Sequence, residues 1–73
     1  MDKYFHVALR ARSTDPEFPT DIYQRAYKAS LISRDAAVDD LCALAGRRFD
    51  ELEWVVMADS QARLEELIDR LKA

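Results

Sequence analysis

The sequence predicts a small α+β domain with the element order β-α-α-β-α, in which a two-stranded antiparallel sheet packs on helices. Residues 3–12 alternate as a half-buried strand does, and residues 49–58, FDELEWVVMA, are a second strand candidate. Between and after them, apolar residues recur at helical spacing. The 73 residues contain no linker or low-complexity stretch, so we expect one domain over residues 1–73.

The first strand is predicted over 3–12, the sequence KYFHVALRAR. Phe5, Val7 and Leu9 alternate with Tyr4 and His6, and this period of two is typical of a strand with one face on a core. Residues 13–19 contain both prolines of the chain and predict an ordered loop.

Helices are predicted over 20–31 and 35–45. In the first, Thr20 or Asp21 acts as the N-cap and the apolar residues follow a period of 3.6: Ile22, Tyr23, Ala26, Tyr27 and Leu31. In the second, Ser33 or Asp35 is the cap, and the inward residues are Val38, Leu41, Cys42 and Ala45. Gly46 stands where a helix commonly ends in a left-handed residue.

The second strand, 49–58, precedes a final helix. Asp59 or Ser60 caps this helix, whose inward residues have the spacing i, i+3, i+4, i+7: Leu64, Leu67, Ile68 and Leu71. An antiparallel pairing of the two strands places Arg10 and Arg12 near Glu51 and Glu53, which favours that direction.

This pairing predicts an apolar outer sheet face. We expect Tyr4, His6 and Ala8 to share it with Val55 and Met57, while Leu52, Trp54, Val56 and Ala58 face the core with the first strand's Phe5, Val7 and Leu9. Either a helix or another molecule must cover this face, and the two free strand edges need blunting or a partner. The sequence therefore predicts an interaction surface on or beside the sheet.

The composition argues against an enzyme. One glycine, one cysteine and one histidine supply neither a phosphate-binding loop nor a metal-ligand set nor a nucleophile with its base. His6 is interpreted as a strand-face residue and Cys42 as a buried structural thiol. We predict no catalytic residues, no metal and no cofactor.

The favoured function is that of a protein-binding module, a regulator or inhibitor that docks on a larger protein assembly. A phage- or plasmid-encoded inhibitor of host machinery, such as transcription, fits a compact, acidic domain with a net charge of -3. The predicted partner-binding residues lie on the outer sheet face and the first loop: Tyr4, His6, Arg10, Arg12, Phe18, Val55 and Met57.

Two alternatives remain open. One is a homodimer joined through strand edges. The other is a weak nucleic-acid binder, with an arginine patch formed by Arg10, Arg12, Arg47 and Arg48. The acidic balance disfavours nucleic acid and membrane partners, no apolar run reaches the length of a membrane helix, and a single cysteine favours the reducing cytoplasm.

Overall fold

The computed structural model describes residues 3–12 and 20–72. Within them the chain forms strand β1 (Tyr4–Arg12), strand β2 (Thr20–Lys28), helix α1 (Arg34–Ala45), a single 3-10 turn η1 (Phe49–Glu51), strand β3 (Leu52–Ala58) and helix α2 (Gln61–Lys72). The predicted α+β class is confirmed. The predicted loop over 13–19 lies outside the described residues.

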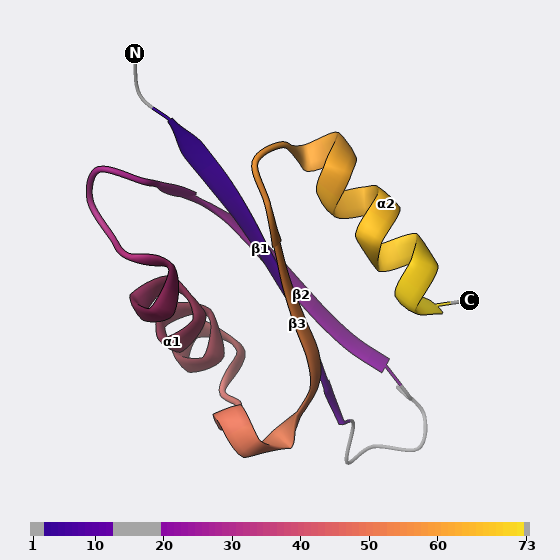
Figure 1. Ribbon diagram of the computed structural model, residues 1–73. Helices are drawn as coiled ribbons and strands as arrows, with labels where there is room; N and C mark the ends of the chain where they lie inside the picture. Colours follow the sequence, from indigo (N-terminus) through magenta and orange to yellow (C-terminus); the bar gives the residue numbers. More distant parts are fainter. Residues whose placement is uncertain (1–2, 13–19, 73) are drawn as a thin grey trace.

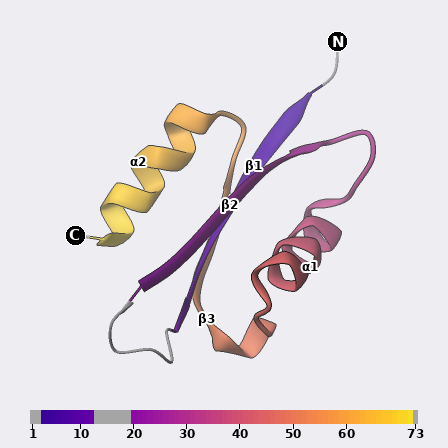
Figure 2. The same cartoon turned by 180° about the vertical axis from the view of Figure 1, so that it is seen from behind.

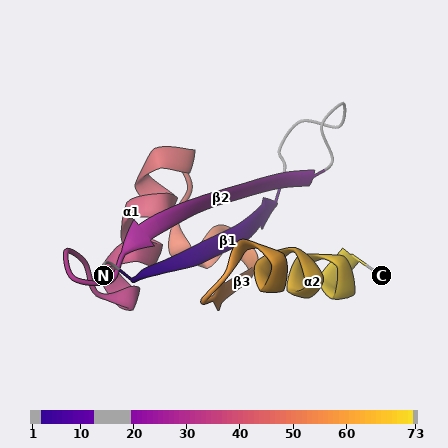
Figure 3. The same cartoon turned by 90° about the horizontal axis from the view of Figure 1, so that it is seen from above.

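The sheet has three strands in the order β2-β1-β3, with both neighbouring pairs antiparallel (Figure 3). The prediction of two strands in the order β-α-α-β-α is therefore wrong in one element: residues 20–28 form a strand where a helix was expected. The predicted antiparallel pairing of the first and last strands is confirmed, and the Arg10 Nε atom lies 3.0 Å from an Oε2 atom of Glu53.

The error at β2 has a physical cause. Ile22, Tyr23, Ala26 and Tyr27 fit a helical stripe, but Tyr23 and Tyr27 also share one face of a strand. There they pack on the apolar core beneath α1. As a strand, this segment also pairs with β1 along all nine residues, and that long-range pairing outweighs a local helical pattern.

Helices α1 and α2 lie on opposite sides of the sheet (Figures 1 and 2). The core on the α1 side consists of side chains from both layers: Phe5, Val7, Leu9, Tyr27, Ala37, Val38, Leu41 and Cys42. On the α2 side, Ala8 packs with Leu64 and Ile68 and with the half-buried Trp54, Val56 and Ala58. Each face therefore carries a helix of the same chain, so the inference that a different molecule covers the outer sheet face is wrong.

The predicted facing of β3 is also corrected. Val7 lies opposite Met57 and Leu9 opposite Val55, so these two β3 residues share the α1 side with the first strand's core residues. Trp54 and Val56 lie on the α2 side instead. In a regular strand, Leu52 would lie on the same face as Trp54, two residues later. The pairing of β1 with β3 shifts register between Arg10 and Ala11, and Leu52 therefore packs on the α1 side instead.

Both helices begin at predicted caps, and α1 also ends at the predicted glycine. Ser33 caps α1 by accepting a hydrogen bond from the backbone N–H of Ala36 at 3.2 Å. Gly46 ends α1 with φ 68°, and the next backbone N–H, that of Arg47, donates to the carbonyl of Cys42 at 2.9 Å. Ser60 caps α2 through the backbone N–H of Arg63 at 3.2 Å.

Candidate functional site

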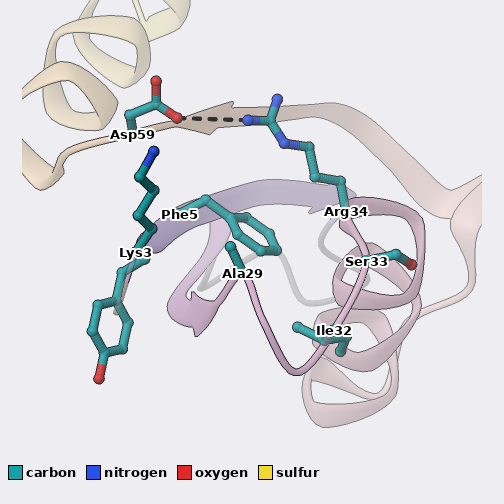
Figure 4. Close-up of a pocket in the computed structure, with 8 residues that line it drawn as sticks. Lys3, Phe5, Ala29, Ile32, Ser33, Arg34 and Asp59 are labelled. Carbon is teal, nitrogen blue, oxygen red and sulfur yellow. Dashed lines mark ion pairs between the residues drawn. The ribbon is translucent and has the colours of Figure 1, made fainter. Parts of the chain in front are cut away.

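An open pocket of about 640 Å³ lies at one corner of the molecule. Three segments far apart in the sequence meet there: the start of β1, the connection from β2 into α1, and the turn between β3 and α2 (Figure 4). The lining residues are Lys3, Tyr4, Phe5, Ala29, Ile32, Ser33, Arg34 and Asp59.

The apolar part of the pocket is continuous with the α1-side core. Phe5 is buried and its ring stacks on that of Tyr27, with 5.8 Å between the ring centroids. Ile32 is half-buried and packs against the same core. Because these side chains are held by the core, the pocket presents a rigid apolar surface.

The rim carries opposite charges. The Arg34 guanidinium reaches an Asp59 carboxylate oxygen at 3.5 Å and lies over the Phe5 ring, 5.9 Å from its centroid (Figure 4). Both members of this ion pair are mostly exposed, with 66% and 92% of their side-chain surface accessible, so the pair contributes little to folding. Lys3 adds a second cation at the same rim.

Two exposed large apolar side chains belong to the segments that form the pocket. Tyr4, one of the lining residues, is 50% exposed. Leu31, which directly precedes the lining residue Ile32, is 78% exposed, the largest value among the exposed large hydrophobic residues of the described chain. The Leu31 backbone N–H donates to the Lys28 carbonyl at 3.1 Å, so the turn that carries Leu31 is itself anchored.

The structure brings Tyr4 to this pocket but distributes the other predicted partner-binding residues elsewhere. His6 is half-buried in the middle strand, opposite Ala26 and Ala58. Val55 and Met57 are half-buried and pack against the α1-side core. Arg10 contacts Glu53, Arg12 is exposed at the end of β1, and Phe18 lies outside the described residues.

The four arginines of the alternative patch come from different layers. Arg10 lies in the sheet beside Glu53, whereas Arg47 and Arg48 follow the C-terminus of α1. Arg48 is itself ion-paired, with 3.4 Å between its Nε atom and Asp50. Arg10 and Arg48 therefore already face carboxylates of the same chain, which reduces the positive potential a phosphate backbone would meet.

Of the eight lining residues, sequence reasoning placed only Tyr4 in a candidate site and missed the other seven, among them Ile32, Arg34 and Asp59. A weak signal existed, since Ile32 immediately precedes the cap Ser33, a position whose apolar side chain commonly folds back onto the helix. No sequence signal predicted the contact between Arg34 and Asp59. The two residues are far apart in the sequence, separated by α1, η1 and β3, and only the fold brings them together.

The Cys42 thiol lies in an environment that disfavours its reactive thiolate form. Cys42 is buried in α1, and burial, assisted by the nearby Asp39 charge, raises the pKa of its thiol. Within residues 3–12 and 20–72, no three His, Cys, Asp or Glu side chains gather closely enough to hold a metal ion. Neither helix in these ranges is long and apolar enough to cross a membrane.

Comparison of the chain with protein-family models, with curated proteins and with solved structures finds no match.

Proposed function

We propose that the protein is a small protein-binding module that acts as a regulator or inhibitor of a larger protein in the cytoplasm, by binding rather than by catalysis. The observation that carries the proposal is the corner pocket, whose lining combines the buried Phe5 with the exposed side chain of Tyr4. Tyrosine is one of the residue types enriched among the energetic anchors of protein interfaces.

The chemistry of the pocket indicates what the partner presents. Phe5 and Ile32 suit an apolar side chain, which would lose its hydration on entering. Arg34 and Lys3 at the rim suit a neighbouring carboxylate, which would replace the exposed contact between Arg34 and Asp59. We therefore expect a partner segment that carries an acidic residue beside a large apolar one.

The experiment compares capture of partners from the native host lysate by the wild-type protein and by two variants. Tyr4→Ala removes an exposed aromatic side chain at the pocket, and Phe49→Ala removes one from η1, where 65% of the residue is exposed. We expect Tyr4→Ala to weaken the binding free energy by at least about 1 kcal/mol, because truncated anchors commonly cost this much. The dissociation constant would then rise about fivefold.

Phe49→Ala is the matched control and should retain binding, with circular dichroism verifying that both variants fold. Binding is then repeated with the purified partner, and an Arg34→Glu variant tests the charge requirement. A partner that binds all three variants like the wild type would show that the corner pocket is not the docking site.

A further inference from the structure

The outer edge of β2 is regular and open. β2 pairs with β1 without a bulge over nine residues, Thr20–Lys28. In Figure 2 β2 lies nearest the viewer, and no described segment passes in front of it. Among residues 3–12 and 20–72, no strand pairs with this edge along residues 22–26, which makes it a template for another strand, and β2 carries neither a proline nor a bulge that would block it.

The hydrogen-bond pattern identifies which residues face outward. The Ala29 backbone N–H donates to the Lys3 carbonyl at 2.9 Å, and these residues continue the register of the β1–β2 pair. Hydrogen-bonded pairs alternate along an antiparallel ladder, so Tyr27, Arg25 and Tyr23 direct their backbone groups to β1. Ile22, Gln24 and Ala26 therefore direct theirs to the open edge.

The other edge of the sheet is a poorer template. The same alternation points the backbone groups of β1 residues His6, Ala8 and Arg10 toward β3, so Ala58, Val56 and Trp54 point back toward β1. Only Val55 and Met57 remain to face outward between the register shift and the end of β3. β2 is the longer and more regular of the two edges.

We propose that a second copy of this chain adds to the β2 edge in antiparallel fashion, with Gln24 of each copy on the two-fold axis. This register pairs all nine residues of the two strands and forms one six-stranded sheet. It lets Ile22, Gln24 and Ala26 of each copy exchange about six backbone hydrogen bonds with the other. A two-fold interface of this kind closes on itself and does not extend into fibres.

Side chains favour this register. Ile22 of one copy lies opposite Ala26 of the other, which brings a half-buried and an exposed apolar side chain together. Arg25 lies opposite Tyr23 of the second copy, on the face where its guanidinium already lies 5.5 Å from the centroid of its own Tyr27 ring. If the second copy slides by two residues in one direction, Arg25 of one copy lies opposite Arg25 of the other. A slide of two residues in either direction also leaves two residues of each strand unpaired.

A cysteine placed at the axis tests the register. In Gln24→Cys the two Cα atoms would lie about 5.5 Å apart, within the range that a disulfide spans. In the matched control Ala26→Cys they would lie about 14 Å apart, because residue 26 is offset by four positions from its copy. We expect mild oxidation to give a covalent dimer of Gln24→Cys and none of Ala26→Cys or of the wild type, whose Cys42 is buried.

Light scattering behind a sizing column tests the dimer itself. We expect the monomer mass at low micromolar concentration and the dimer mass at hundreds of micromolar. Ala26→Pro removes an outward N–H and should abolish the dimer while keeping the monomer's circular dichroism, whereas Ala26→Ser should retain the dimer. A monomer mass at every concentration, an Ala26→Pro dimer, or equal cross-linking of both cysteine variants would overturn the proposal and leave the pocket proposal intact.

Discussion

At the scale of single residues, Tyr27 connects the sheet to α1. Its ring is buried against Phe5, and its hydroxyl donates a 2.9 Å hydrogen bond to Asp40 of α1. Burial, with the Asp40 hydrogen bond and charge, raises the pKa of Tyr27 from 10.0 to about 12. Its neutral form is therefore more stable in the folded protein than in the unfolded chain.

This pKa predicts a loss of stability in alkali. Between pH 10.0 and about 12 the unfolded chain releases the Tyr27 proton while the folded protein keeps it, so the free energy of unfolding falls as pH rises through this range. Tyr27→Phe should lose about 1 kcal/mol near neutral pH, the usual contribution of one hydrogen bond, and this deficit should shrink toward pH 12. Urea unfolding at several pH values measures both effects, and a constant deficit would contradict the assignment.

At the scale of elements, α2 covers the face of β1 that carries Ala8, which the sequence assigned to the outer side of the sheet. Its amphipathic spacing places Leu64, fully buried, and Ile68 on Ala8 and the half-buried Trp54. A side-chain hydrogen bond of 3.1 Å from Gln61 to Gln24 links the start of α2 to β2. Without α2, the apolar residues on this side of β1 and β3 would face water.

Leu64→Ala should therefore destabilise the protein by about 2–5 kcal/mol, the usual cost of truncating a buried leucine. Trp54, the chain's only tryptophan, packs on this cluster, so its fluorescence should report the same transition as circular dichroism. Leu44→Ala, on an exposed position of α1, is the matched control and should change stability by less than about 0.5 kcal/mol. Equal costs of the two variants would mean that α2 does not dock as described.

At the scale of the whole molecule, β1 is the structural centre. It pairs on both sides, and Val7, Ala8 and Leu9 have no accessible surface. The helices cover its two faces, and the corner pocket opens where β1 begins. The candidate site and the open β2 edge are thus both positioned by the same central strand.

Amide hydrogen exchange should be slowest in the central strand β1. The N–H groups of Val7 and Leu9 should exchange slowest, because their opening requires separation of the buried sheet. The outward N–H groups of Ile22, Gln24 and Ala26 should exchange fast at low protein concentration and slower at high concentration. Fast exchange in the middle of β1 would contradict the strand order.

Local signals were enough to predict much of the fold. Ser33, Gly46 and Ser60 end or begin helices through hydrogen bonds within a few residues, so their effect is visible in the sequence. The direction of β3 was also predictable, because Arg10 and Glu53 mark opposite-charge neighbours. The candidate site was not, apart from Tyr4, since its lining comes from three distant segments.

By itself, the sequence determined the α+β class, both ends of α1, the start of α2, and the antiparallel pairing of β1 with β3, because each follows from contacts near in sequence or from matched charges. Only the tertiary structure decided that residues 20–28 are a strand and that each sheet face has its own helix. The spacing of Ile22, Tyr23, Ala26 and Tyr27 satisfies a helix and a strand alike. The second free edge of β1 selects the strand, since its backbone groups need hydrogen-bond partners that a helix cannot provide.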